Sequence, residues 1–213
     1  GGASHADLAR IVAERGYSDA VIRTFVAVPV EDAVVRRRLA GARSLLPELR
    51  GVRWTAERQL HFTLKFLGDL EAERLADARQ ATAAAAHRGP GSFRLALEGL
   101  GAFPPRGAAR VVWAGCGSGA TELASLAGTV EEAFEAAGFP REERPFSPHL
   151  TLARVRDPLS GRRLAQALPS VPGEPFGTVV VGSIVLYRSD LSPAGPEYSE
   201  LLRVALESNA APQ

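Results

Sequence analysis

A four-residue pattern occurs twice in this chain and constrains its fold more than any other feature. His61-Phe62-Thr63-Leu64 and His149-Leu150-Thr151-Leu152 both read His-x-Thr-Leu inside apolar, strand-prone runs, 88 residues apart. Side chains two positions apart on a strand share a face, so each copy presents an imidazole beside a hydroxyl. Two such copies facing one cleft would place two proton-transfer groups and two hydrogen-bond donors around one ligand.

The elements around the two motifs repeat in the same order. β-branched and aromatic runs predict strands, and apolar residues at helical spacing predict amphipathic helices. The first strands overlay at the same offset of 88 residues, which matches Phe25 with Trp113. The predicted order of strand, helix, histidine strand and helix covers 23–28, 34–46, 60–67 and 71–87, then 111–116, 123–137, 148–155 and 159–168.

This duplication predicts an α+β fold with two pseudo-symmetric lobes. Each lobe is expected to be an antiparallel sheet with helices on its outer face, and the active-site cleft is expected between the lobes. We expect one bilobal domain over residues 21–208. Residues 1–20 are interpreted as an N-terminal extension, partly vector-derived, and residues 209–213 as a frayed tail.

Composition excludes several classes of protein. A chain of 213 residues, 46% of them hydrophobic, can bury a substantial core. The net charge of +1 gives no overall attraction to a long nucleic-acid duplex. A single cysteine, Cys116, excludes an intramolecular disulfide and a cysteine metal cluster. No apolar run is long enough for a membrane span and no secretory signal is visible, so a cytoplasmic location is expected, with no membrane contact and no obligate protein partner.

The residues around both motifs carry a family resemblance. Residues 61–68 (HFTLKFLG) and 146–154 (FSPHLTLAR), with supporting segments at 23–27, 112–115 and 186–189, resemble the paired motifs of the 2H phosphoesterases. The similarity is greatest to the branch of RNA 2′,3′-cyclic phosphodiesterases, historically called 2′-5′ RNA ligases. It extends from about Val21 to Leu206. One His-x-Thr is a weak signal, but two at this spacing with these flanks are a strong one.

The resemblance implies a chemistry that suits two histidines. Opening a 2′,3′-cyclic phosphate needs a base for the attacking water and an acid for the departing ribose oxygen, and the imidazole pKa near 6.5 allows both states. By resemblance, His149 is the proton acceptor and His61 the proton donor, which yields a 2′-phosphomonoester. The residues alone leave this assignment open. Thr63 and Thr151 would donate hydrogen bonds to phosphate oxygens. Neither a metal nor another cofactor is implied.

Arg154 is a further candidate for phosphate binding. Strict strand alternation places it on the face opposite His149, whereas the family pattern places a phosphate-binding arginine there, which requires a bulge or the end of the strand. The alternative is a surface ion pair. Phe66 occupies the corresponding position in the first copy, so the two motifs are not equivalent.

Other residues are weaker candidates. Phe25, Trp54 and Phe146 could contact a nucleobase, and core packing is the alternative for each. Alternation places Lys65 on the face of His61, either in the cleft or pointing to solvent at its rim. Basic residues that could guide an RNA end are Arg23, Arg53, Arg106, Arg110 and Arg156.

Three functions fit these residues. The first is hydrolysis of RNA 2′,3′-cyclic phosphate ends, and the second is the reverse-type reaction that joins such an end to a 5′-hydroxyl as a 2′-5′ linkage. The third is an RNA-end-binding module without turnover, which the presence of both histidines and both threonines disfavours. The expected partners are RNA ends or small nucleotides that bear a 2′,3′-cyclic phosphate.

Overall fold

Two antiparallel sheets form the framework of the protein. A computed structural model describes residues 21–173, 175–192 and 195–207, so the expectations for residues 1–20 and 209–213 lie outside the described residues. The first sheet has the order β3-β1-β8-β9 and the second has the order β2-β6-β5-β4-β7. The strands are β1 (Ile22–Pro29), β2 (Val52–Trp54), β3 (His61–Leu70), β4 (Phe93–Phe103), β5 (Val111–Cys116), β6 (Leu150–Val155), β7 (Pro175–Val181), β8 (Ser183–Ser192) and β9 (Gly195–Ala205).

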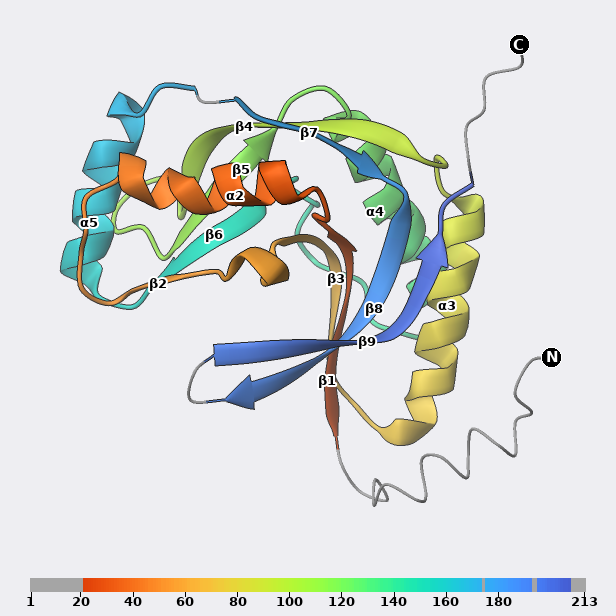
Figure 1. Cartoon of the computed structure of the whole chain (residues 1–213). Coiled ribbons are helices and arrows are strands. Elements are labelled where there is room, and N and C mark those ends of the chain that lie inside the picture. Colours follow the sequence, from red (N-terminus) through yellow and green to blue (C-terminus); the bar gives the residue numbers. More distant parts are fainter. Residues whose placement is uncertain (1–20, 174, 193–194, 208–213) are drawn as a thin grey trace, which may run out of the picture.

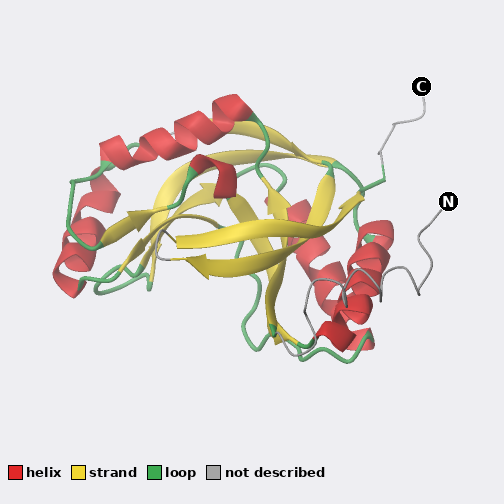
Figure 2. Cartoon of the chain, turned by 60° about the horizontal axis from the view of Figure 1, so that its bottom comes forward, coloured by secondary structure: helices red, strands yellow, loops and turns green. Residues whose placement is uncertain are grey.

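Four α-helices within the described residues surround the sheets (Figure 1 and Figure 2). They are α2 (Ala33–Gly41), α3 (Leu75–Arg88), α4 (Ala120–Ala136) and α5 (Pro158–Ala167). Asp32 and Asp157 cap α2 and α5, because each carboxylate accepts hydrogen bonds from two backbone N–H groups of the first turn. The predicted α+β architecture with two sheets and surrounding helices is confirmed.

The lobes are not the two halves of the chain. β2 and β4 come from the first half but pair in the second sheet, and β8 and β9 return from the end of the chain to the first sheet. Helix α2 likewise packs against β7 of the second sheet, whereas α3 packs against β8, β9 and α4. The chain therefore exchanges elements between its lobes, which holds them together.

One apolar core extends through both sheets. Val26 and Phe62 of the first sheet belong to the same buried cluster as Leu97 and Leu150 of the second. A smaller cluster around Leu164 lies where α5 meets β2, β5 and β6. Because the main core is continuous, the motifs on β3 and β6 are held on a single rigid framework.

The strand pairing corrects one detail of the predicted duplication. β1 pairs with β3 so that Ala27 faces Thr63, and β5 pairs with β6 so that Trp113 faces Thr151. Trp113 therefore corresponds to Ala27 and not to Phe25. The first strands are offset by two residues fewer than the histidine motifs, because loop lengths between the elements differ in the two halves.

Candidate active site

The two histidines are oriented by the same hydrogen bond. His61 begins β3 and lies with Nδ1 2.6 Å from the carbonyl oxygen of Gln59. His149 immediately precedes β6 and lies with Nδ1 2.7 Å from the carbonyl oxygen of Ser147. A carbonyl oxygen can only accept, so Nδ1 carries the proton in both rings. Nε2 is thus left on each histidine to accept or donate a proton.

A β-bulge follows each histidine and changes which residues face the site. The pairing of β3 with β1 skips Leu64, and the pairing of β6 with β5 skips Leu152. Each extra residue shifts the alternation by one position. Phe66 and Arg154 therefore join the histidine faces. The bulge that a phosphate-binding role for Arg154 requires is present.

Arg154 brings charge across from the second sheet to the first. Burial lowers the pKa of His61 on β3, and the guanidinium of Arg154 adds to this shift. Burial raises the pKa of Tyr198 on β9, and the same guanidinium opposes that rise. His149 also lowers the pKa of His61. The two motifs therefore act on one another through space, as a shared site requires.

Burial is the main reason why His61 holds a proton weakly. Desolvation lowers the pKa of His61 from 6.5 to about 4, with smaller contributions in the same direction from Arg154 and His149, while the hydrogen bond to Gln59 opposes the shift. His61 is accordingly neutral at pH 7 in the ligand-free protein. An anion bound between the histidine and Arg154 would favour the protonated ring and raise this pKa.

The expectation for Lys65 was wrong. Its side chain is buried, with 3% of the residue exposed, and Nζ lies 2.8 Å from Oε1 of Glu131 and 2.9 Å from the carbonyl oxygen of Pro140. The bulge at Leu64 removes Lys65 from the His61 face. Glu131 Oε1 also accepts a hydrogen bond from the Glu142 backbone N–H at 2.9 Å. This ion pair thus ties β3 to α4 and to the segment that leads to His149.

The two threonines are placed as predicted. Thr63 and Thr151 are half-buried, two positions after their histidines and before each bulge. Among the described residues, no hydrogen bond engages either side-chain hydroxyl. Both are therefore available to donate to a ligand oxygen, and their contact with phosphate stays a prediction.

Aromatic rings surround both histidines, and sequence reasoning missed the most important of them. Tyr198 stands edge-on to His61, with ring centroids 5.3 Å apart and an interplanar angle of 87°. Phe103 stands edge-on to His149 at 4.9 Å and 89°. Neither ring lies near its histidine in sequence, so only the strand exchange brings them together. Their regular strand context gave no sequence signal for either.

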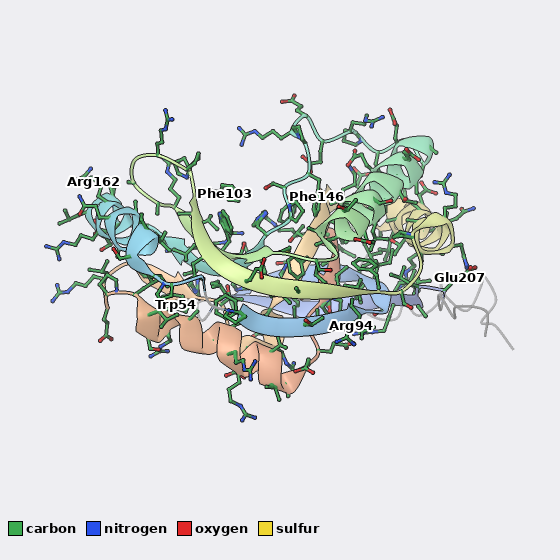
Figure 3. All side chains as sticks on the ribbon, turned by 90° about the horizontal axis from the view of Figure 1, so that it is seen from above. Trp54, Arg94, Phe103, Phe146, Arg162 and Glu207 are labelled. Carbon is green, nitrogen blue, oxygen red and sulfur yellow. The ribbon has the colours of Figure 1, made fainter. Side chains whose placement is uncertain are left out.

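The predicted aromatic contacts are mostly packing contacts. Phe25 is 4% exposed and lies against His61, Tyr187 and Tyr198, which leaves no ring face for a nucleobase. Its predicted role as a substrate contact is therefore corrected to packing beneath His61. Trp54 and Phe146 are half-buried and pack against the apolar core, so nucleobase stacking by either stays a prediction. Figure 3 shows Phe103 and Phe146 on one side of the curved strand β4.

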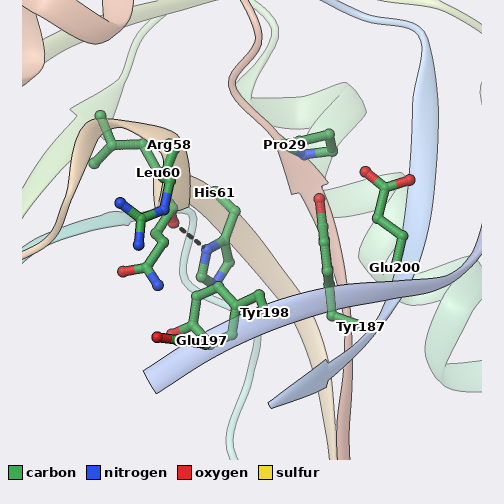
Figure 4. A pocket seen from close by; sticks show the side chains of 9 residues that line it. Pro29, Arg58, Leu60, His61, Tyr187, Glu197, Tyr198 and Glu200 are labelled. Atoms are coloured by element: carbon green, nitrogen blue, oxygen red, sulfur yellow. Dashed lines mark hydrogen bonds between the residues drawn. The ribbon is translucent and has the colours of Figure 1, made fainter. Parts of the chain in front are cut away.

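A cavity of about 320 Å³ opens beside His61 (Figure 4). Its walls come from β1, the segment before β3, and the strands β8 and β9. The lining residues are Pro29, Arg58, Gln59, Leu60, His61, Tyr187, Glu197, Tyr198 and Glu200. The Gln59 side chain donates a hydrogen bond to the carbonyl oxygen of Pro196, which fastens β9 to the segment that orients His61. A cavity of this size accommodates one nucleoside.

The described residues contain neither a metal-binding cluster nor a membrane-spanning helix. No group of three or more His, Cys, Asp or Glu side chains in this part of the chain is arranged to hold a metal ion. None of the described helices is long and apolar enough to cross a membrane.

Comparison with known proteins agrees with this architecture. The model of the 2′-5′ RNA ligase superfamily matches residues 30–193, and the chain belongs to this superfamily. A protein from Archaeoglobus fulgidus named RNA 2′,3′-cyclic phosphodiesterase is 34% identical over 180 residues, which cover 84% of this chain and 98% of the relative.

Solved structures show the same fold. A crystal structure of a Thermus thermophilus protein matches with a TM-score of 0.72 and 32% identity, covering 88% of this chain and 99% of the other. E. coli LigT in complex with 3′-AMP matches with a TM-score of 0.70 and 28% identity, with the same coverage. The chain therefore shares its fold with these two proteins.

Proposed function

We propose that this protein hydrolyses RNA 2′,3′-cyclic phosphate ends to 2′-phosphomonoesters with two histidines as acid and base. The observation that carries the proposal is the matched pair of imidazoles. Each is fixed through Nδ1 to a backbone carbonyl and keeps Nε2 for proton transfer, and the charge of Arg154 on β6 reaches His61 on the other sheet. The name of the Archaeoglobus fulgidus relative supports the substrate class.

The shape of the site supports the assignment of the two roles. Both ribose oxygens of a cyclic phosphate belong to one nucleoside, and the cavity beside His61 has room for that nucleoside. The oxygen that departs would then face His61, which protonates it. Water would approach from the side of His149, whose Nε2 takes its proton.

The pKa of His61 fits a donor that is charged by its substrate. The ring is neutral in the free protein because its pKa is lowered to about 4. A phosphodiester bound next to it supplies the negative charge that favours the imidazolium. The acid is thus formed when the substrate is in place, and the two histidines together carry one proton through the cycle.

Three further groups would stabilise the phosphate. Thr63 and Thr151 donate hydrogen bonds from opposite lobes to its non-bridging oxygens, and Arg154 compensates the charge that grows in the transition state. Because these groups and the two histidines provide every proton transfer and charge contact that the reaction needs, no metal takes part in the proposed mechanism.

A 2′-5′ ligation is a second candidate at the same site. It replaces the attacking water by a 5′-hydroxyl and uses the same base and acid. The segment that carries the His149 hydrogen bond is exposed, so a larger nucleophile can approach from that side. Water at high concentration favours hydrolysis.

The test follows product formation by phosphorus NMR. An RNA oligonucleotide that ends in a 2′,3′-cyclic phosphate is incubated with the protein in EDTA. We expect a 2′-phosphomonoester, and a loss of rate of about 10²–10⁴-fold in both His61→Ala and His149→Ala. A 3′-monoester would overturn the assignment of the leaving oxygen. Ligand binding without turnover in the unaltered protein would favour the RNA-end-binding module.

A second substrate separates the two histidine roles. A nitrophenyl phosphodiester has a leaving group that departs without a proton. His61→Ala should therefore recover most of its activity on this ester, whereas His149→Ala should remain inactive. The opposite pattern would exchange the acid and the base.

A further inference from the structure

The arginines of this protein are concentrated at one end of the second sheet. The segments 49–56, 102–111 and 153–163 contain eight arginines and a single carboxylate. The rest of the chain contains 17 basic and 23 acidic residues, a net charge of −6. The overall charge of +1 therefore conceals a strong separation of charge. The eight residues, which we term the arginine end, are Arg50, Arg53, Arg106, Arg110, Arg154, Arg156, Arg162 and Arg163.

Backbone hydrogen bonds hold these segments side by side. The Val155 N–H donates to the Arg110 carbonyl at 2.8 Å, and the Arg156 N–H donates to the Gly51 carbonyl at 2.9 Å. Arg53 of β2 is the direct pairing partner of Arg154 on β6. Arg53 and Arg154 therefore lie on adjacent strands, while Arg110 directly precedes β5 and Arg156 directly follows β6 at the same end of the sheet.

Helix α5 packs closely against the same end of the second sheet. The Ala109 N–H donates to the Gly161 carbonyl at 3.1 Å, and a Cβ at Gly161 would lie 2.4 Å from the Ala109 carbonyl oxygen. Only glycine allows this approach, which places Arg162 and Arg163 beside the β4–β5 connection. Figure 3 shows Arg162 at this end, where nitrogen-tipped side chains gather.

The positive charges are not neutralised within the protein. All eight arginines are exposed, and within the described part of the chain none of them forms an ion pair. The one carboxylate, Asp157, accepts hydrogen bonds from the Ser160 backbone N–H at 2.8 Å and from the Ser160 hydroxyl at 2.7 Å. These bonds, with a smaller contribution from the charge of Arg162, lower the pKa of Asp157, and a single carboxylate cannot balance eight guanidinium groups. Such a surface attracts an external polyanion.

The opposite side of the site lacks this excess of positive charge. The cavity beside His61 is lined by Glu197, Glu200 and Arg58, and Arg203 pairs with Glu200. Further phosphates of a substrate would gain little attraction there. Arg154 belongs both to the site and to the arginine end, so a strand that leaves the site along β6 meets the arginines at once.

We infer that the arginine end binds the sugar–phosphate backbone of an RNA strand whose cyclic phosphate end lies between His61 and His149. This inference rests on the proposed function for the position of that end. Because of this surface, we expect a higher kcat/KM on RNA strands than on single nucleotides. Arginine side chains contact backbone phosphates without regard to base, so the binding is expected to be independent of sequence.

The experiment compares two substrates that share the reacting group. We would measure kcat/KM for a 2′,3′-cyclic mononucleotide and for an RNA decamer ending in a 2′,3′-cyclic phosphate, at 50 and 200 mM salt. The variant is Arg162→Gln with Arg163→Gln. Its matched control is Arg88→Gln with Arg94→Gln, which removes two exposed charges from outside the arginine end.

The variant should lower kcat/KM for the decamer about tenfold and flatten its salt dependence by about one unit in log–log slope, because two single-strand phosphate contacts are lost. Mononucleotide turnover and the control should not change. Equal loss on both substrates, or no loss on the decamer, would overturn the inference. Preferential binding to phosphatidylserine vesicles without an effect of RNA length would also overturn it.

Failure of the proposed function gives a different result. In that case neither substrate is turned over by the unaltered protein. Fluorescence anisotropy of the labelled decamer then tests the surface by itself. Weaker binding of the arginine-end variant, but not of the control variant, would still support RNA binding by the arginine end. Equal binding by the unaltered protein and both variants would overturn it.

Discussion

The two sides of the site share a motif but have different walls. On the His61 side, β9 runs along β8 from Ser183 to Ser192, so Tyr198 and Glu197 close a cavity beside the ring. On the His149 side, β7 pairs with β4 only from Phe93 to Glu98, and the end of β4 that carries Phe103 has no strand on its outer side among the described residues. His61 therefore lies beside a cavity with walls from β1, β8, β9 and its own segment, whereas the ring that contacts His149 lies at an unpaired end of β4.

This difference explains how a duplicated motif can perform two roles. The local chemistry of the two histidines is the same, down to the hydrogen bond from Nδ1 to the carbonyl two residues earlier. What distinguishes them is burial, which lowers the pKa of His61, and the space beside each ring. The motif supplies the reactive imidazole, and the neighbouring strands determine whether that imidazole acts as the acid or as the base.

The asymmetry between the two sides is tested most strongly at Arg154 and Phe66, which occupy equivalent positions after the two bulges. Arg154→Gln removes the charge that reaches His61 and Tyr198, and we expect kcat to fall by about 10²–10³-fold, as for other lost transition-state donors. Phe66→Ala alters an exposed ring that contacts Phe25, and kcat should change by less than about threefold. Steady-state kinetics on the cyclic mononucleotide measures both.

Arg154→Lys serves as the control for charge alone. It should recover part of the rate, since a lysine ammonium keeps the positive charge but lacks the planar fork of guanidinium. Equal losses at Arg154 and Phe66 would mean that the two lobes contribute equally, which contradicts the asymmetry.

A second prediction concerns the ion pair that joins the two sides. Lys65→Met removes the charged partner of Glu131, and only 15% of the Glu131 side chain is exposed. Breaking a pair buried to this extent costs about 3–5 kcal/mol. We expect the free energy of unfolding, measured by urea denaturation, to fall by an amount near the lower end of that range.

The double variant Lys65→Met with Glu131→Leu separates charge from packing. It should recover much of the lost stability, because no unpaired carboxylate remains. If it is as unstable as the single variant, then the Lys65 contact with the Pro140 carbonyl matters more than the ion pair.

The sequence predicted the elements and the reactive residues better than the walls around them. His61, His149 and both threonines lie where two-residue alternation places them, since that rule acts over a few residues of one strand. Alternation failed at Lys65, because the bulge at Leu64 reverses the positions that follow it, up to a second irregularity at Leu67. At Arg154 the bulge at Leu152 moves the side chain from the face opposite His149 to the face that carries His149.

The strand exchange was beyond the reach of local patterns. Tyr198 and Phe103 meet the histidines only because β9 returns to the first sheet and β4 joins the second. A strand of either kind shows the same alternation wherever it pairs. The sequence did suggest Arg53, Arg106, Arg110 and Arg156 as basic residues that could guide an RNA end. The net charge near zero gave no sign that they gather at one end of a sheet, because charge balance is a sum over the chain and says nothing of position.

The pH dependence of the free energy of unfolding reports on the burial of His61. The pKa of His61 is about 4 in the folded protein and near 6.5 when unfolded. Between these values the unfolded chain binds the extra proton, so acidification from pH 6.5 towards pH 4 favours unfolding. The stability lost through this group is at most about 3 kcal/mol.

His61→Gln removes this contribution and should lose less stability over the same pH range, as measured by urea denaturation at a series of pH values. Phe66→Ala, which alters an exposed ring and no titratable group, is the matched control and should keep the pH dependence of the unaltered protein. Inorganic phosphate adds a second readout, because an anion bound beside His61 should raise its pKa in an NMR titration of the imidazole. A pKa of His61 that stays low with phosphate bound would contradict an acid that is charged by its substrate, and His61 would then serve as the base.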